Sequence, residues 1–331
     1  MPRITMEDVA RAAGVSRALV SLAYRDRPGV SAETRARILE AGAALGYTPN
    51  RIAAQLAGNG GNTLGVFLQD LHNDLFADFY EGIVEVADAG SKEIVLSIGT
   101  IDGSRDVAAL ETLHQLRVDV ILVGGLQLDD EAIRALSARV PVVCVFRAVS
   151  GVDSVVSDDR FGAVAATRHL LDLGHRRIAF LANPPGNVYG HRREGYEAAM
   201  LGAGLKPRVV ASSYARHDAA RDTVALLDAH HPPTAVFAHN DQAALGALDA
   251  LALRGLRAGQ DVSVVGYDNS SVSRFPGSAL TTVDVDGVSL GRSAAEVALL
   301  RLDDPAAPAR LLNSTPALVV RSTTGPAPQQ H

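Results

Sequence analysis

The stretch T-M-E-D-V-A-R-A-A-G-V-S-R-A-L-V-S at residues 5–21 decides how the N-terminal part of the chain folds. Thr5 and Asp8 form a T-x-x-D capping box, which predicts that a helix begins here. Gly14 suits the left-handed conformation that ends helices, and Ser16 is a good N-cap for a second helix. Two short helices separated by Gly-Val favour a helix-turn-helix, although any small three-helix bundle fits the same residues.

The second and third helices are expected at about residues 17–24 and 32–45. Pro28-Gly29 breaks the chain between them, and Ser31 caps the third helix. The apolar side chains of the second helix face inward in this arrangement. Its outward face carries the residues that can approach DNA, which are Arg17, Ala18, Ser21 and Arg25.

Charge is distributed unevenly along the chain. The formal net charge of −6 for the whole sequence argues, by itself, against binding to nucleic acid. Residues 1–60, however, hold eight arginines and five acidic residues, a net charge of +3, so the rest of the chain carries −9. A basic head on an acidic body is the distribution expected if only the head meets DNA phosphates.

Composition indicates a soluble globular protein of two or three units. The chain has 331 residues, of which 47% are hydrophobic and 21% charged. Cys144 is the only cysteine of the sequence, which excludes an internal disulfide and argues against a cysteine zinc site. No apolar run approaches the roughly 20 residues of a membrane span, and the N-terminus lacks a signal-peptide core. We therefore expect a cytoplasmic protein, nucleoid-associated when bound to DNA, without a metal.

A short helix and a glycine-rich linker are expected after the head, within residues 49–62. Asn50 is a good N-cap, residues 51–57 are good helix formers, and Gly58 is a C-cap followed by N-G-G-N. A helix of under two turns is not stable alone in water. We expect it to need a partner, which is either a second copy of itself or DNA.

From Thr63 onward the sequence alternates between short apolar segments and amphipathic helices. The expected strands are Leu64–Leu68, Ile94–Ile98, Val120–Val123, Val142–Val145, Ile178–Leu181, Ala235–Ala238 and Val262–Val265. The expected helices include Phe76–Ala89, Gly162–Leu173, Arg193–Ala203 and Gln242–Arg254. This alternation favours parallel sheets covered on both faces. It predicts two doubly wound lobes with a cleft between them, in which ligands gather at the carboxyl ends of strands.

Several motifs together resemble those of one family. The head carries D-V-A-x-x-A-G-V-S at 8–16, V-S-x-x-T-R at 30–35 and L-G-Y-x-P-N-x-x-A-x-x-L at 45–56. The body carries G-H-R-R-I-A-F at 174–180, R-x-x-G-Y at 192–196, N-D-Q-x-A-L-G-A-L at 240–248, D-V-S-V-V-G-Y-D at 261–268 and L-T-T-V at 280–283. In this combination the chain resembles the lactose repressor family, also called the galactose repressor family.

The resemblance implies a homodimer or a tetramer, with the dimer as the default, whose chains are built from a head, a hinge and a core. A helix-turn-helix head at 1–48 is joined by a hinge helix and linker at 49–62 to a core at 63–325 that is similar to periplasmic sugar-binding proteins. The implied lobes of the core are about 63–157 with 286–316, and about 158–285 with 317–325.

The resemblance also implies how the head binds a pseudo-palindromic operator. The second helix enters the major groove, with Arg17, Ala18 and Leu22 at the base-reading positions. Arg17 can contact guanine through two hydrogen bonds, or it can clamp a phosphate instead. Leu56 of the hinge is expected to wedge between base pairs in the minor groove, or else to pack on its own head. The full set of expected DNA contacts is Thr5, Ser16, Arg17, Ala18, Ser21, Leu22, Arg25, Val30, Asn50, Arg51, Ala53 and Leu56.

A small-molecule effector is expected in the cleft of the core. The contacts implied by the resemblance are Phe76, Arg192, Asn240 and Asp268, with Arg147 and Asp158 as second-rank candidates at the edge between the lobes. Phe76 can equally be a core residue, and Asn240 can equally cap a helix. An aromatic platform beside an arginine and carboxylate or carboxamide groups suits a sugar. A nucleobase stays open, because the same residue types stack and hydrogen-bond purines.

Other classes of protein fit the sequence less well. It has no G-x-G-x-x-G after the first strand, no Walker motif, no H-E-x-x-H among its ten histidines and no G-x-S-x-G. These absences argue against an enzyme, and a periplasmic sugar carrier has no use for residues 1–60. We expect a transcription regulator, in the first place a repressor, with no catalytic residues and no cofactor.

Overall fold

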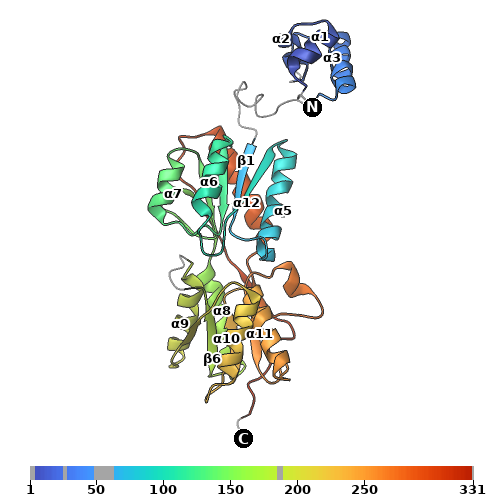
Figure 1. Cartoon of the computed structure of the whole chain (residues 1–331). Helices are drawn as coiled ribbons and strands as arrows, with labels where there is room; N and C mark the ends of the chain where they lie inside the picture. The colour runs from blue at the N-terminus through green and yellow to red at the C-terminus, as the bar shows by residue number, and fades with distance from the viewer. Residues whose placement is uncertain (1–3, 25–27, 48–62, 185–188, 330–331) are drawn as a thin grey trace. The chain divides into compact units, whose positions relative to one another are not determined.

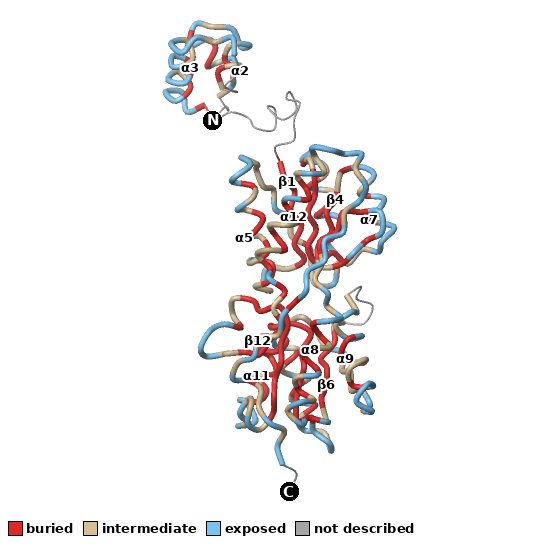
Figure 2. The backbone as a smooth tube through the Cα atoms, turned by 180° about the vertical axis from the view of Figure 1, so that it is seen from behind, coloured by how far each residue is buried: buried red, intermediate tan, exposed pale blue. Residues whose placement is uncertain are grey.

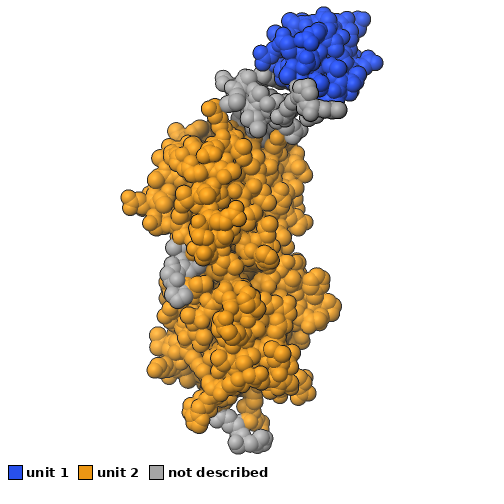
Figure 3. Space-filling view, in the orientation of Figure 1, with its two compact units in different colours: residues 1–60 blue, residues 61–331 orange. Residues whose placement is uncertain are grey.

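The computed structural model describes most of the chain, namely residues 4–24, 28–47, 63–184 and 189–329 (Figure 1). The chain divides into two compact units, Met1–Gly60 and Gly61–His331, which Figure 3 colours separately. We call them the head and the core. The expected combination of a small all-α unit with a larger α/β unit is confirmed.

Within its described residues the head consists of three helices, α1 (Met6–Ala13), α2 (Arg17–Tyr24) and α3 (Ala32–Leu45). The expected capping box at the start of α1 is present. Thr5 N donates to Asp8 Oδ2 at 3.0 Å, and Thr5 Oγ1 accepts from Asp8 N at 3.4 Å. Two N–H groups that the first helical turn leaves without a partner are thereby satisfied.

The ends and the packing of these helices also follow from the local sequence. Gly14 and Gly46 end α1 and α3 with φ of 64° and 68°, a left-handed conformation that costs glycine little. Val9, Val20 and Ile38, one from each helix, are fully buried in a common cluster. The apolar side of α2 therefore faces inward and its polar side faces solvent.

The N-lobe of the core is built on a parallel sheet that has six strands among the described residues. Their order is β11 (Leu311–Ser314), β5 (Asp153–Ser157), β4 (Val142–Val145), β3 (Val120–Gly124), β1 (Thr63–Leu68) and β2 (Glu93–Ile98). The covering helices are α5 (Asp74–Ala89) and α12 (Gly287–Asp303) on one face, and α6 (Asp106–Gln115) and α7 (Asp130–Ser137) on the other. Successive strand residues point to opposite faces. Leu64 and Val66 therefore pack with α5 and α12, while Phe67 packs with α6 and α7.

The C-lobe has the same layered design around a shorter parallel sheet. In the part of the chain that the structure describes, its order is β7 (Arg208–Ala211), β6 (Ile178–Ala182), β8 (Ala235–Ala238) and β9 (Ser263–Val265). Its helices are α8 (Asp159–Asp172) and α9 (His191–Gly202) on one face, and α10 (Arg216–Leu227) and α11 (Asp241–Leu253) on the other. The expectation of two doubly wound lobes is confirmed.

The lobes are connected covalently by extended segments. Over the described residues, the chain crosses between the two sheets at 157–159, 284–287 and 314–317. Beside two of these crossings, β10 (Thr282–Asp284) pairs antiparallel with β12 (Ala317–Val319). The crossings bring the carboxyl ends of the strands of both sheets toward the same region.

Figure 2 shows the strands at the centre of each lobe as buried and the outer sides of the helices as exposed. All seven apolar segments that were expected to be strands form strands. The sequence pattern did not predict β5, β7, β10, β11 or β12. Both β7 and β11 are edge strands, and none of their residues is buried.

Glycine allows the closest packing of helices in the N-lobe. A Cβ on Gly291 of α12 would collide with the carbonyl oxygen of Phe79 in α5, and a Cβ on Gly82 of α5 would collide with that of Val288 in α12. Gly202, at the end of α9, has no atom within 4 Å of the position a Cβ would take.

We predict that Gly291→Ala lowers the free energy of unfolding by about 1–3 kcal/mol, because α5 and α12 must move apart. Gly202→Ala is the matched control and should be neutral or stabilising by up to about 1 kcal/mol. Urea denaturation of both variants measures the difference, and equal effects would contradict close α5–α12 packing.

Candidate functional site

A cleft lies between the two lobes of the core. Many of its lining residues lie at or shortly after the carboxyl ends of strands. Those from the N-lobe include Gln69, Gly125 and Phe146, after β1, β3 and β4. Those from the C-lobe include Asn183, His239 and Asp268, after β6, β8 and β9. The cleft therefore occupies the position at which open parallel sheets bind ligands.

The N-lobe wall of the cleft is aromatic. The rings of Phe76 and Phe146 meet edge to face, with centroids 5.9 Å apart, and Phe79 lies behind them at 5.4 Å from Phe146. Phe146 has a φ of 70°, which is strained for a bulky side chain. Such strain persists only where the surroundings impose it, and it is common at functional sites.

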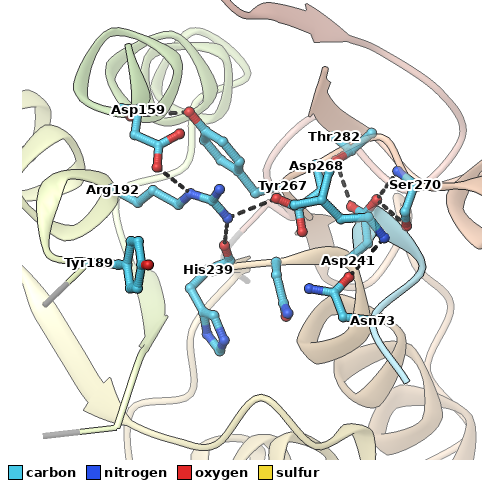
Figure 4. A network of polar contacts seen from close by, with 12 residues as sticks. Asn73, Asp159, Tyr189, Arg192, His239, Asp241, Tyr267, Asp268, Ser270 and Thr282 are labelled. Carbon is cyan, nitrogen blue, oxygen red and sulfur yellow. Dashed lines mark hydrogen bonds and ion pairs between the residues drawn. The ribbon is translucent and has the colours of Figure 1, made fainter. Parts of the chain in front are cut away.

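Arg192, at the start of α9, organises the C-lobe wall. Its Nε donates to Asp159 Oδ2 at 3.0 Å, and its Nη1 lies 2.9 Å from Asp268 Oδ1 (Figure 4). Nη1 also donates to the carbonyl oxygen of His239 at 2.6 Å. The guanidinium carbon lies 3.9 Å from the centroid of the Tyr267 ring, a cation–π contact. One side chain thus ties together α8, β8, β9 and α9.

Asp268 is held in an unfavourable environment. It is 2% exposed and has a φ of 109°, a backbone conformation that residues other than glycine rarely adopt. Within the described part of the chain, neither of its carboxylate oxygens accepts a well-directed hydrogen bond. Burial raises the pKa of Asp268, and the neighbouring carboxylate of Asp241 raises it further, although Arg192 opposes both effects.

Asp241, by contrast, is fully satisfied inside the C-lobe. It accepts from Thr282 Oγ1 at 2.6 Å, from Ser270 N at 2.8 Å and from Ser270 Oγ at 3.0 Å. Figure 4 shows this network beside Asp268. Asp241 therefore has a structural role, because it connects α11, η1 (Ser271–Arg274) and β10.

Asn240 has a double role at the start of α11. Its Oδ1 accepts from Ala243 N at 2.9 Å, so the helix-cap reading of this residue is confirmed as a contact. Its Nδ2 is buried and has no hydrogen-bond partner among the described residues. Asn240 therefore presents a donor without a partner at the cleft that it lines.

Two side chains, Gln242 and Tyr189, make polar contacts directly between the lobes near the cleft. Gln242 Nε2, on α11, donates to the carbonyl oxygen of His72 at 2.9 Å and to Asp74 Oδ2 at 3.0 Å. Tyr189 Oη donates to the carbonyl oxygen of Leu126 at 3.1 Å. The lobes are therefore held together by noncovalent contacts that lie next to lining residues.

Four of the predicted effector contacts line this one cleft: Phe76, Arg192, Asn240 and Asp268. Sequence reasoning missed other lining residues, which include Gln69, Asn73, Phe146, Asp159, Asn183, Tyr189, Tyr214 and His239. The available signal for four of them, Gln69, Phe146, Asn183 and His239, was their position just after an apolar strand, where ligands gather in such folds.

The other two predicted contacts, Arg147 and Asp158, are not among the lining residues. Arg147 is buried in the N-lobe, where its Nη2 donates to Leu128 O at 2.7 Å and lies 3.2 Å from Asp130 Oδ1. Asp158 caps α8 by accepting from Phe161 N at 2.9 Å. Both side chains are directed at local partners instead of the cleft.

The head presents the outward side of α2 to solvent. Arg17 and Ala18 are exposed, and Ser21 and Leu22 are half-buried. The hydroxyls of Thr5 and Ser16 cap α1 and α2, and Val30 is half-buried against the head core. The remaining predicted DNA contacts lie outside the described residues: Arg25, Asn50, Arg51, Ala53 and Leu56.

Comparison with known proteins agrees with this architecture. Residues 5–50 match the family described as Bacterial regulatory proteins, lacI family, and residues 167–324 match the Periplasmic binding protein-like domain. The ribose operon repressor of Haemophilus influenzae is 30% identical over 325 residues, which cover 96% of this chain and 98% of that relative.

Two solved structures extend the likeness over nearly the whole chain. The Lac repressor dimer bound to operator and the anti-inducer ONPF has a TM-score of 0.84 and 31% identity, covering 98% of this chain and 99% of its own. The transcriptional regulator CelR–cellobiose complex has a TM-score of 0.72 and 29% identity, covering 97% of this chain and 100% of its own.

A helix-turn-helix head joined to a two-lobed core with a polar cleft defines a DNA-binding transcription regulator. The relatives compared above are transcription regulators as well. Within that class, the chain belongs to the lacI family of bacterial regulatory proteins. Among the residues described, no helix combines the length and the apolar character that crossing a membrane requires.

We predict that Asp268→Asn changes how stability depends on pH. The folded-state pKa of this carboxyl is raised above its ordinary value of 3.8, so its contribution to stability is full below that value and is lost as the pH rises through the folded pKa. Asparagine does not ionise, so the variant does not lose stability in this way as the pH rises. The free energy of unfolding of the variant, relative to wild type, should therefore increase between about pH 4 and pH 8.

Urea denaturation at both pH values measures this change. Asp303→Asn is the control, because Asp303 is exposed. A difference between Asp268→Asn and wild type that stays constant with pH, or that falls as the pH rises, would show that burial does not govern this carboxyl.

Proposed function

We propose that the chain represses transcription as a homodimer on a pseudo-palindromic operator, and that a sugar bound in the cleft changes its operator affinity. The observation that carries the proposal is the set of buried polar atoms in the cleft without hydrogen-bond partners among the described residues, which includes Asn240 Nδ2, His239 Nε2 and Asp268 Oδ2. A buried polar group without a partner costs about 1–3 kcal/mol, so it calls for an explanation. A ligand that hydrogen-bonds these atoms provides one.

The chemistry of the cleft supports a sugar. Asn240 Nδ2 needs an acceptor and Asp268 needs donors, and a hydroxyl group can serve as either. The ring of Phe76 offers an apolar surface for the C–H face of a sugar. The similarity to the ribose operon repressor and to the CelR–cellobiose complex points in the same direction. A nucleobase is the alternative, because it also stacks on aromatic rings.

For DNA binding, we infer that α2 enters the major groove. Arg17 and Ala18 are exposed at its start, and no described residue bonds to the Arg17 side chain in the contacts that the structure records. Arginine in this position can form two hydrogen bonds with guanine. Leu22 offers an apolar contact to a thymine methyl group, and we also assign to the DNA surface Thr5 at the start of α1, Ser16 and Ser21 of α2, and Val30.

Coupling between the two functions requires a path from core to head. We assign residues 1–48 to the head, 49–62 to the hinge and 63–325 to the core, and we propose that the hinge is ordered when two copies pair on DNA. An effector can shift this balance only through different affinities for the two states. By reciprocity, operator DNA must change effector affinity by the same factor. The wedge assigned to Leu56 stays a prediction.

We further propose that the chain has no catalytic activity and acts in the cytoplasm, on the chromosome. The relatives compared above are named as regulators, and none of their names describes an enzyme.

We predict that Arg17→Ala weakens operator binding by about 1–3 kcal/mol, which is about 5- to 150-fold, and binding to random DNA much less. Operator sequences are first selected from random duplexes, and affinities are measured by fluorescence anisotropy. Arg37→Ala, at an exposed arginine on α3, controls for the loss of one charge. Equal losses on operator and random DNA would make Arg17 a phosphate contact.

A second variant separates sensing from DNA binding. Asn240→Ser keeps a side-chain oxygen that can cap α11, because serine is a good N-cap, but it removes the Nδ2 donor. We predict about 5- to 150-fold weaker effector binding with unchanged effector-free operator affinity. A thermal-shift screen of sugars and nucleobases on the full chain identifies the ligand. Asn313→Ser, at an exposed residue of β11, is the control. Unchanged ligand affinity would reduce Asn240 to a helix cap.

A further inference from the structure

His239 lies directly after β8 and lines the cleft at 1% exposure. Its backbone N–H and its ring Nδ1 both approach the carbonyl oxygen of Leu181, at 3.1 Å and 3.0 Å. Its own carbonyl oxygen accepts from Arg192 Nη1 at 2.6 Å, as Figure 4 shows. The ring of Tyr214 packs edge-on against the imidazole, with the two ring centroids 4.9 Å apart. These contacts fix both the position and the orientation of the ring.

The contact with Leu181 also fixes which ring nitrogen carries the hydrogen. A carbonyl oxygen can only accept, so Nδ1 must be the protonated nitrogen of a neutral imidazole, and Nε2 must then be an acceptor. Burial lowers the pKa of His239 to about 3, so Nε2 stays unprotonated at neutral pH. Nε2 has no hydrogen-bond partner among the described residues.

A second buried histidine shows how this chain treats an imidazole that is purely structural. His175 is fully buried, and its Nδ1 pairs with Thr234 Oγ1 at 2.9 Å. Its Nε2 pairs with Ser263 Oγ at 2.9 Å and with Gly325 O at 3.0 Å. Packing alone therefore does not explain why one nitrogen of His239 is left without a partner beside a cleft.

We propose that His239 is a specificity-determining residue of the cleft, whose Nε2 accepts a hydrogen bond from an O–H or N–H group of the effector. This inference rests on the proposed function, in which the cleft binds an effector. An effector with a hydrogen atom in place of that group leaves Nε2 without a hydrogen bond. An effector with an ether or carbonyl oxygen there places a second acceptor against Nε2. Such effectors are rejected.

Asn240, beside His239, further limits which groups an effector can carry. Asn240 is the next residue in the chain after His239. Its Nδ2 is a hydrogen-bond donor without a partner among the described residues. The two residues together require a donor and an acceptor on the ligand, one for each of these atoms. Hydroxyl groups meet both requirements, whereas a deoxy or O-methyl position fails to supply the donor.

The first test needs no ligand. Full-length protein labelled with ¹⁵N-histidine is studied by long-range ¹H–¹⁵N NMR, and His239→Gln assigns the signal. At about pH 5.5 an ordinary histidine, with a pKa near 6.5, is mostly protonated. His239 should instead show a protonated Nδ1 and an unprotonated Nε2. A protonated Nε2, as either the other tautomer or the imidazolium, overturns the proposal.

The second test measures selectivity with defined probes. Ribose, glucose, galactose and cellobiose are each compared with their single-deoxy and O-methyl analogues by calorimetry on the full chain. For at least one hydroxyl group of the sugar that binds, the wild-type protein should bind the parent sugar about 5- to 150-fold more tightly than the deoxy or O-methyl analogue altered at that hydroxyl. His239→Leu, which removes the acceptor, should bring that ratio close to one, and His239→Gln, whose carboxamide oxygen accepts, should retain a preference. His230→Gln, at an exposed histidine, should leave every ratio unchanged.

The two tests separate this proposal from the proposed function. If no sugar binds, the sugar-sensing proposal fails, and the NMR experiment still decides the state of His239. If a sugar binds and His239→Leu keeps all the parent-to-deoxy ratios of wild type, the role of His239 is overturned while sugar sensing stands. Loss of folding in His239→Leu is detected by circular dichroism, and the ratios are then taken from His239→Gln, where a complete loss of preference counts against the proposal.

Discussion

The cleft depends on one buried positive charge. Arg192 lies between the carboxyl groups of Asp159 and Asp268 and over the ring of Tyr267, so two carboxyl groups share one cation in a buried region. Burying ions is costly unless each is paired, and removing one partner of such a cluster costs several kcal/mol. The cluster therefore holds the ends of β8 and β9 and the starts of α8 and α9 in register, and this register sets the shape of the C-lobe wall.

Much of the fold could be read from local signals. The capping box of Thr5 and Asp8 fixes a helix start within four residues, and fully buried strands such as β1 and β3 are continuous apolar runs because both of their faces are covered. The edge strand β11 escaped prediction for the converse reason. Its residues are all exposed, so no burial shapes its sequence into an apolar run.

The site was only partly predictable, because the role of a polar residue depends on partners that are distant in sequence. Phe76, Arg192, Asn240 and Asp268 line the cleft as the motifs implied. Nothing in the local sequence shows that the carbonyl oxygen of Leu181, 58 positions from His239, accepts a hydrogen bond from the imidazole Nδ1. Nor does it show that Nε2 of the same ring has no partner among the described residues. Conversely, Arg147 was expected at the edge of the cleft, but the carbonyl of Leu128 and the carboxylate of Asp130 hold it within the N-lobe.

The placement of lining residues just after strands has an evolutionary consequence. Several of these side chains lie on loops at the strand ends, outside the hydrogen-bond ladders of the sheets, although Phe76 and Phe146 also pack in the N-lobe core. Residues on such loops can be exchanged while the scaffold that carries them is retained. A descendant of this chain can therefore acquire a different effector through a few substitutions of lining residues such as Tyr214, while the residues of its head stay unchanged.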